Sequence, residues 1–446
     1  MIYQILIVAL IIEALVAFWK PKYAIGICLA IIFLFPNSLK FNVGINLNSF
    51  NLAVIIVVLS LVKTILTTKS LYPQIPRTIK FYTIYVATTS FFCALTNISF
   101  GEYIQNMILF VMEYGLIAYA LSWICMGEKD FKVFNIVLIT VSCIIICYGL
   151  LNYATKINPY MAYISMVTDS EIDMSNSFME EQRGLLDGRI SSVFPHPLQL
   201  GQWSLLVFAY FYYELKEKVN SFFYYTFLFL IFIIAFMTGS RSALVPILLV
   251  PIINLLHQSP FKIIRYSILA VFSLIVLFPF LPNKVQDNVE ATVFFGDDEA
   301  ASKAEIRGSS KDGRIGQFEI ALSEIRDNPL LGKGFNYSSK NREKLSAGLL
   351  GLESIFLSHI IDGGILGLII FIFFYITLYR KIRNSCDSNM TKAMADSLCI
   401  PFFISISLTG ISYSFFCVYL IFYMIMQYKI QTIQYPSNCK LVKNLK

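Results

Sequence analysis

Three arginines lie where long apolar segments give way to short polar ones, and their side chains suit the binding of an anionic group. Arg183 and Arg189 flank a glycine-containing stretch just before an apolar segment, and Arg241 lies in the turn Thr238–Ser242 between two apolar segments. A guanidinium group donates hydrogen bonds in a planar fork that fits two oxygens of a phosphate or carboxylate. These positions therefore predict a site for an anionic ligand.

The same arginines also have purely structural interpretations. Arg183 and Arg189 could anchor their loop to lipid headgroups or to the acidic residues before them, such as Glu180, in weak surface ion pairs. Arg241 could extend its side chain to the membrane boundary. Charged residues at the depth of Arg241 are costly and usually functional, which favours a ligand role for this residue.

A second group of basic residues precedes an amphipathic segment. Arg307 and Arg314 come before apolar residues that repeat at helical spacing, so we expect a short helix that Asp312 caps and Pro329 ends. The first turn of this helix, together with Arg314, is a further candidate anion site. The helix would lie on the membrane or cap the helical bundle.

One carboxylate stands where it could accept a proton. Glu353 precedes the apolar segment that begins near Ser354, so a partly desolvated position could raise its pKa and make it a general base. Alternatively, it only interacts favourably with the start of that helix. For His359, one turn further along, packing is favoured over catalysis.

The composition decides what kind of protein carries these residues. The chain has 446 residues, of which 57% are hydrophobic and 14% charged. Soluble domains have about 25% charged residues. The composition therefore excludes a soluble enzyme and a disordered chain, and the scattered basic residues argue against nucleic-acid binding. We expect a polytopic membrane protein.

Thirteen segments are apolar and long enough to span a bilayer as helices, so an all-α fold with about 12–14 transmembrane helices is predicted. They cover residues 2–19, 23–38, 50–68, 81–98, 105–125, 132–154, 197–214, 220–239, 241–258, 263–282, 354–378, 393–410 and 413–430.

Lys and Arg gather in alternate connections and in the C-terminal tail, which predicts a cytoplasmic C-terminus and an external N-terminus. The long segments 155–196 and 283–351 then form two outer loops, where function is expected. They separate three groups of transmembrane helices, in residues 1–154, 197–282 and 352–446.

No cofactor or metal is predicted. The nine cysteines all lie outside the two long loops, no spacing resembles a zinc site, and there is no phosphate-binding loop or dinucleotide fingerprint. Glu13, Glu113 and Asp396 fall within predicted spans without basic partners there, which is a weak signature of an ion-coupled transporter.

Four stretches together resemble the O-antigen ligase/polymerase-like superfamily of bacterial membrane proteins. They are an arginine followed by Phe-Pro before a span, a Ser-Arg turn between spans, a helix followed by Pro-Leu-Leu-Gly-x-Gly, and a helix start ending in Gly-x-x-Gly. Here they read Arg189–Pro197, Gly239–Ser242, Arg314–Gly334 and Glu353–Gly367. The resemblance covers about residues 183–378.

The resemblance implies metal-independent, inverting glycosyl transfer on the outer face of the bacterial inner membrane. The donor would be an oligosaccharide on undecaprenyl pyrophosphate, whose leaving pyrophosphate needs positive charge. Arg189, Arg241 and Arg314 would bind it, with Arg183 and Arg307 as weaker candidates, and Glu353 would be the base.

The resemblance favours a polymerase over a ligase. Ligases that join polysaccharide to lipid A–core tend to have a His-Asn pair where this chain has Glu353-Ser354. A polymerase would join lipid-linked repeat units into O-antigen or capsular polymer, with a chain-length regulator as a possible partner. The ligase remains the alternative within the superfamily, and a lipid-linked oligosaccharide flippase or transporter is the alternative from another class.

Overall fold

The structure is a computed structural model of the full chain. It describes residues 1–42, 46–67, 99–111, 126–168, 182–183, 186–216, 218–259, 311–341, 354–410 and 413–434, with a few isolated residues between them. All statements below concern these residues.

The described chain is almost entirely helical, which confirms the all-α prediction. Six helices are long and apolar enough to cross a membrane: α1 (Ile2–Trp19), α7 (Glu128–Thr155), α12 (Arg241–Gln258), α19 (Ile355–Asn384), α20 (Asn389–Leu408) and most of α21 (Tyr413–Gln434). Shorter apolar stretches lie in α2 (Pro21–Leu34), α3 (Ser49–Thr67) and α11 (Ser221–Met237). Helix α10 (Pro197–Glu214) packs against α11, α12, α20 and α21. The protein is a multi-pass membrane protein.

The helix boundaries follow the predicted spans with one important difference. The predicted span 354–378 is not one straight helix, because α19 breaks at Gly364, whose φ of 66° is left-handed. The ring centroids of His359 and Phe371 lie 4.0 Å apart, whereas twelve residues of a straight helix would cover about 18 Å. The first part of α19 therefore folds back toward the second. The predicted spans 81–98 and 263–282 lie outside the described residues, apart from a few isolated positions, and so does most of 105–125 beyond residue 111.

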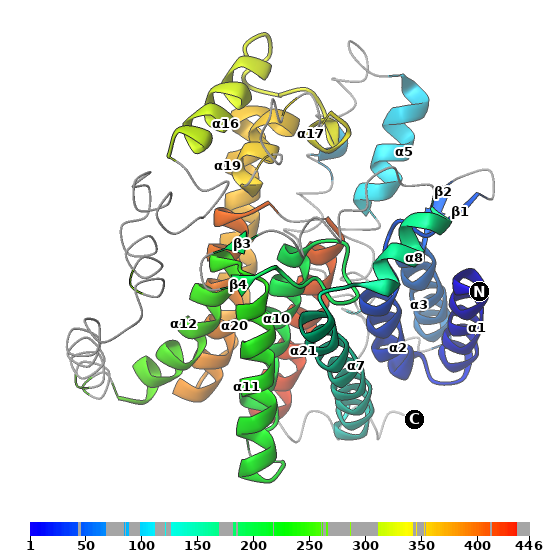
Figure 1. Cartoon of the computed structure of the whole chain (residues 1–446), viewed down its shortest axis with the longest axis vertical. Coiled ribbons are helices and arrows are strands. Elements are labelled where there is room, and N and C mark those ends of the chain that lie inside the picture. Colours follow the sequence, from blue (N-terminus) through cyan, green and yellow to red (C-terminus); the bar gives the residue numbers. More distant parts are fainter. Residues whose placement is uncertain are drawn as a thin grey trace.

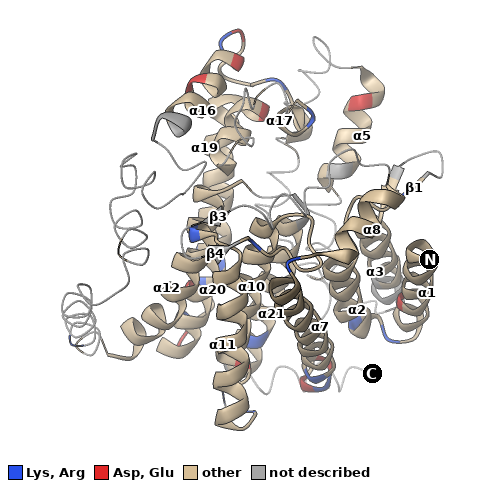
Figure 2. Ribbon diagram, in the orientation of Figure 1, with Lys and Arg blue, Asp and Glu red and all other residues tan. Residues whose placement is uncertain are grey.

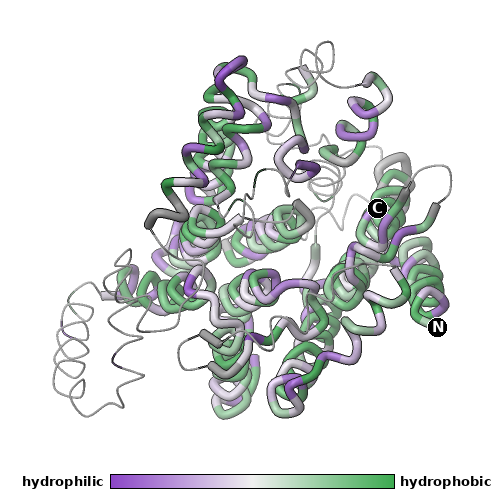
Figure 3. The backbone as a smooth tube through the Cα atoms, turned by 45° about the horizontal axis from the view of Figure 1, so that its top comes forward, coloured by the Kyte–Doolittle hydropathy of each residue, from purple (hydrophilic) through white to green (hydrophobic). Residues whose placement is uncertain are grey.

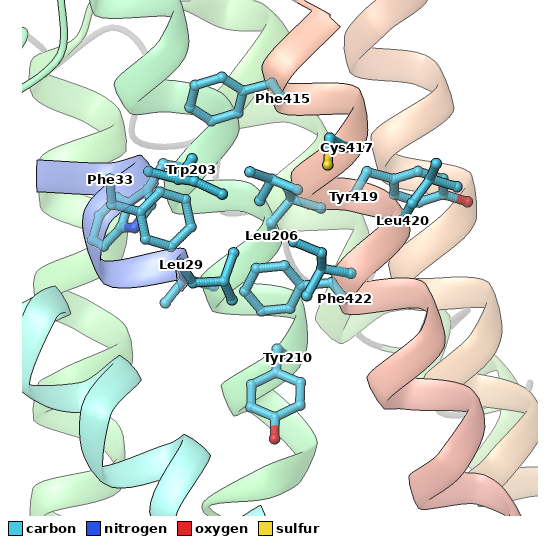
Figure 4. Close-up of a cluster of buried hydrophobic side chains, with 14 of the residues drawn as sticks. Leu29, Phe33, Trp203, Leu206, Tyr210, Phe415, Cys417, Tyr419, Leu420 and Phe422 are labelled. Atoms are coloured by element: carbon cyan, nitrogen blue, oxygen red, sulfur yellow. The ribbon is translucent and has the colours of Figure 1, made fainter. Parts of the chain in front are cut away.

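Most helices of the bundle are apolar along much of their length, as Figure 3 shows, so they bury their side chains against one another. Aromatic residues make up a large part of the resulting core. In Figure 4, Trp203 of α10 lies beside Phe33 of α2, and Phe415 of α21 stands nearby. The Phe33 and Trp203 ring centroids are 6.5 Å apart in an edge-to-face arrangement. This arrangement joins the N-terminal, central and C-terminal helices in one core.

Ion pairs tie the helices together at the end opposite Arg241. Asp396 of α20 accepts a hydrogen bond at 2.7 Å from His257 at the end of α12 and forms an ion pair at 3.1 Å with Arg383 at the end of α19. Buried Glu214 of α10 pairs with Lys218 and with Lys429 of α21. The expectation that Asp396 has no basic partner was therefore wrong, because the partners come from helix ends that the span pattern does not bring together.

Smaller elements gather beyond the bundle, at the end where α12 begins. Helices α5 (Phe100–Phe110), α16 (Lys311–Glu324) and α17 (Tyr337–Lys340) lie at the top of Figure 1, and Figure 2 shows acidic residues on α5 and α16. Helix α8 (Pro159–Val167) and the antiparallel pair β3 (Gln182–Arg183) and β4 (Leu186–Asp187) belong to the first long loop. A second pair, β1 (Lys40–Asn42) and β2 (Asn46–Asn48), connects α2 to α3. We call this side the Arg241 end.

Candidate functional site

The predicted arginine turn lies between α11 and α12. Gly239 has a φ of 62°, which lets the chain reverse directly, and α12 begins at Arg241. Ser240 precedes the helix but makes no side-chain capping bond, since its Oγ lies 2.8 Å from the Oγ of Ser242. A helix start presents backbone N–H groups and the positive end of the helix dipole. Arg241 and the start of α12 thus concentrate positive charge at one place.

Arg189 lies across the same turn. Its side chain is 2% exposed, and its Nε donates to the carbonyl oxygen of Thr238 at 2.8 Å. A Cβ atom on Gly239 would lie 3.4 Å from Cγ of Arg189, so this glycine leaves just enough room for the arginine. Residues about 50 positions apart in the sequence therefore meet at one turn.

Asn158, whose role was not predicted from the sequence, holds the loop that carries Arg189 through side-chain hydrogen bonds. Its Nδ2 donates to the carbonyl oxygen of Ser192 at 2.8 Å and to Oγ of Ser191, while its Oδ1 accepts from Tyr148. Ser192 itself donates to the carbonyl oxygen of Ile145. An asparagine in a loop gives no periodic signal, so only the folded structure could identify this role.

Helix α10 connects the arginine turn to the start of α19. Gly201 packs so closely on α12 that an added Cβ would lie 2.7 Å from Cβ of Ala243. Next to it, Nε2 of Gln202 donates to the carbonyl oxygen of Gly410 at 3.3 Å. A Cβ on Gly410 would be 2.8 Å from the carbonyl oxygen of Leu352, two residues before Ser354 caps α19. The arginine turn and the start of α19 therefore border the same short part of α10.

The break in α19 is held by the motif Pro329–Gly334. Backbone hydrogen bonds run from Lys333 N to Ile361 O at 2.9 Å and from Ile365 N to Pro329 O at 2.9 Å. The two backbones touch, because a Cβ on Gly364 would lie 2.3 Å from the carbonyl oxygen of Leu330. We call this contact the glycine clasp. It explains physically why the Pro-Leu-Leu-Gly-x-Gly and Gly-x-x-Gly stretches occur together.

Asp362 fastens the next segment to the clasp. Its Oδ1 accepts from the backbone N–H of Ser338 at 2.7 Å and its Oδ2 from that of Asn336 at 3.1 Å. Asn336 has a φ of 71°, so this carboxylate stabilises an uncommon backbone conformation at the start of α17. Asp362 thus holds α17 over the bent part of α19.

We expect Asp362→Ala to loosen α17, because two backbone N–H groups would lose their acceptor at about 1–3 kcal/mol each. Limited proteolysis of the purified protein should show faster cleavage within residues 335–341. Asp327→Ala is the matched control, because the Asp327 carboxylate is 86% exposed and its ion pair with Lys333 lies at the surface. Equal cleavage rates for the parent and Asp362→Ala would show that the carboxylate does not hold this segment.

Helix α5 contacts α17 and the residues just before it. Lys340 and Glu102 form an ion pair at 3.0 Å, and Nδ2 of Asn106 donates to the carbonyl oxygen of Phe335 at 3.2 Å. The hydrogen bond and charge of Lys340 hold the pKa of Glu102 below its ordinary value. The ring of Phe335 also meets Phe110 edge-to-face at 5.0 Å. The N-terminal part of the chain thereby helps to position the loop that bears the clasp.

The remaining predicted site residues are placed only in part. Arg307 and Glu353 lie outside the described residues. Arg183 is in β3 and Arg314 in α16, but only their backbones are described. The neighbours of Glu353, Leu352 and Ser354, are described, and Leu352 is the residue that lies against Gly410.

The predicted amphipathic helix exists as α16, and Asp312 lies within it rather than before it. It packs against α19, where its buried Ala321 shares a small apolar cluster with Ile361, while Phe318 is 49% exposed. Among the described residues, no group of three or more His, Cys, Asp and Glu side chains could hold a metal ion. The absence of a metal from the site stays a prediction.

The fold and the site together define a polytopic helical membrane protein with an arginine turn and a glycine clasp at one end. Residues 226–372 match the family model described as O-Antigen ligase, and this supports the resemblance to the O-antigen ligase/polymerase superfamily. The matched region runs from α11 through the clasp, and it includes Arg241, Arg307, Arg314 and Glu353. A comparison with curated protein sequences gives no match.

Proposed function

We propose that this protein is a polysaccharide polymerase that joins lipid-linked oligosaccharide repeat units on the outer face of the bacterial inner membrane. The observation that carries the proposal is the meeting of Arg189 and Arg241 at one turn, 2.8 Å separating Nε of Arg189 from the carbonyl oxygen of Thr238. The O-antigen ligase family match over residues 226–372 supports the type of reaction.

In the proposed reaction, a hydroxyl oxygen of the acceptor sugar attacks the anomeric carbon of the donor sugar. The new C–O bond forms as the bond to the pyrophosphate oxygen breaks, which inverts the anomeric configuration. The bonding electron pair leaves with the pyrophosphate, and Glu353 takes the acceptor proton. Fixed positive groups aimed at the leaving group lower the barrier most when little water surrounds them.

The arginines have different tasks in this proposal. Arg241 at the start of α12 contacts the pyrophosphate directly, and Arg189 both contributes charge and holds the turn through its bond to Thr238. Arg314 at the start of α16 and the weaker candidates Arg183 and Arg307 would complete the anion site from the two long loops. The clasp would keep the start of α19, which Glu353 precedes in the sequence, close to that site.

The test is a gel of surface polysaccharide from an in-frame deletion strain beside its complemented strain. A polymerase predicts loss of the ladder with retention of a single-repeat band. Loss of every repeat, with long polymer left on its lipid carrier, would instead identify a ligase. An unchanged ladder would reject both and favour a transporter.

Glu353→Gln tests the proposed base. The amide cannot accept the hydroxyl proton, so we expect the transfer rate to fall about 10²–10⁴-fold, the usual contribution of general acid–base catalysis. The measurement is the chain-length distribution in a strain that expresses the variant at the parent level. Glu319→Gln, at an exposed position of α16, is the control and should leave chain lengths unchanged. Parent chain lengths in Glu353→Gln would remove Glu353 as the base.

A further inference from the structure

Gln202 has a buried side-chain oxygen to which none of the described residues donates a hydrogen bond. The residue is 2% exposed, and its Nε2 donates a hydrogen bond to the carbonyl oxygen of Gly410 at 3.3 Å. Its Oε1 is buried and has no hydrogen-bond partner among the residues that the structure describes. Because more than nine in ten buried polar groups are paired in folded proteins, this oxygen needs an explanation.

The position of Gln202 suggests that a substrate group could pair with this oxygen. The preceding residue, Gly201, has the arginine turn against it, since a Cβ there would lie 3.6 Å from Oγ1 of Thr238 and 3.8 Å from Cβ of Ser240. On the other side, Gly410 joins Gln202 to Leu352. Gln202 therefore stands between the proposed pyrophosphate site and the residue that precedes Glu353, which is where the sugar being transferred must lie.

The chemistry of the amide oxygen narrows the choice of ligand. It is an uncharged acceptor, so it repels a pyrophosphate oxygen but accepts a hydrogen bond from a hydroxyl group. The sugar that is bonded directly to the pyrophosphate carries hydroxyl groups, and in the proposed complex this sugar ring lies next to the arginine turn. A polyprenyl chain has no donor to offer.

We infer that Oε1 of Gln202 accepts a hydrogen bond from a hydroxyl group of the donor sugar attached to the pyrophosphate. This inference rests on the proposed function and adds a specificity residue to it. Nε2 of Gln202 fixes the amide against Gly410, so the oxygen is oriented before the substrate arrives. A site built to pair a substrate hydroxyl discriminates strongly against donors that lack it, because the buried oxygen is then left unpaired.

The experiment uses the purified full chain in lipid nanodiscs, a lipid-pyrophosphate-linked repeat unit as donor and a constant acceptor concentration. Gln202→Met keeps the side-chain length but removes the acceptor oxygen. We expect it to raise the donor KM about three- to tenfold, the effect of one hydrogen bond, or more if the sugar hydroxyl is left unpaired. The inhibition constant of sugar-free polyprenyl pyrophosphate should stay unchanged, because that ligand reaches only the arginine turn.

Two further variants separate recognition from folding. Gln202→Glu keeps an acceptor oxygen, so its donor KM should stay closer to that of the parent than that of Gln202→Met. Gln199→Met, one turn earlier on α10 and only half-buried, is the matched control and should change neither constant.

Equal weakening of the donor and of sugar-free polyprenyl pyrophosphate by Gln202→Met would overturn the inference, because a structural role affects both. An unchanged donor KM would overturn it as well, since a buried water would then satisfy the oxygen. Failure of the proposed function is distinguishable: the parent protein would then show no transfer and no inhibition by polyprenyl pyrophosphate.

Discussion

Arg241→Ala is expected to lower the rate of glycosyl transfer about 10²–10³-fold, while the amount of protein in the membrane stays near that of the parent. Removing one fixed donor to a developing negative charge typically has an effect of this size, which corresponds to about 2.7–4 kcal/mol of transition-state stabilisation. Arg241 is only partly buried at the first turn of α12, so its loss should not unfold the helix. The measurement is single-turnover transfer from lipid-linked donor, together with a membrane immunoblot.

Two companion variants make this experiment specific. Arg241→Lys keeps the charge but loses the planar fork, so an intermediate rate would show that paired hydrogen bonds to phosphate matter. Arg326→Ala removes an exposed arginine beyond α16 and should transfer at the parent rate. A well-expressed Arg241→Ala protein that makes full-length polymer would reject the pyrophosphate role.

Gly364→Ala is expected to abolish activity by a different route, through loss of the glycine clasp. The alanine Cβ would lie 2.3 Å from the carbonyl oxygen of Leu330, and the residue would be held at a φ of 66°. Backbone atoms cannot move aside as a side-chain tip can, so α19 must release Pro329–Gly334 and the bond from Ile365 N to Pro329 O. We expect transfer near background and rapid proteolysis of residues 329–341.

Gly363→Ala is the matched control for this variant. It adds the same methyl group one residue earlier, where no atom lies within 4 Å of the new Cβ. Activity and protease resistance should therefore match those of the parent. If Gly364→Ala behaves like Gly363→Ala, the close backbone approach does not shape the site.

The sequence was sufficient for the features that depend on composition and on local spacing. Apolar segments predicted most helices, and the turn at Gly239 placed Arg241 at a helix start, as the structure has it. The break at Gly364 was not predicted, because apolar residues continue through it and hydropathy does not register a reversal of the backbone.

Side-chain partners between distant segments were beyond such reasoning. The bond from Arg189 to Thr238 joins residues 49 positions apart, and the contact between His257 and Asp396 joins residues 139 positions apart. Neither pair has a periodic signature, since each depends on how whole helices pack. Gln202 gave no signal either, because a lone glutamine in an apolar helix is significant only once its neighbours are known.

The contact between α5 and α17 sets the order in which the protein can be assembled during synthesis. Asn106 bonds to the carbonyl oxygen of Phe335, 229 residues later, and its side chain also meets that of Asn336. At about 5–20 residues per second, the ribosome needs roughly 10–45 s to make the intervening chain. For that time α5 lacks this partner, so we expect chaperones or insertases to protect this helix until the clasp loop is synthesised.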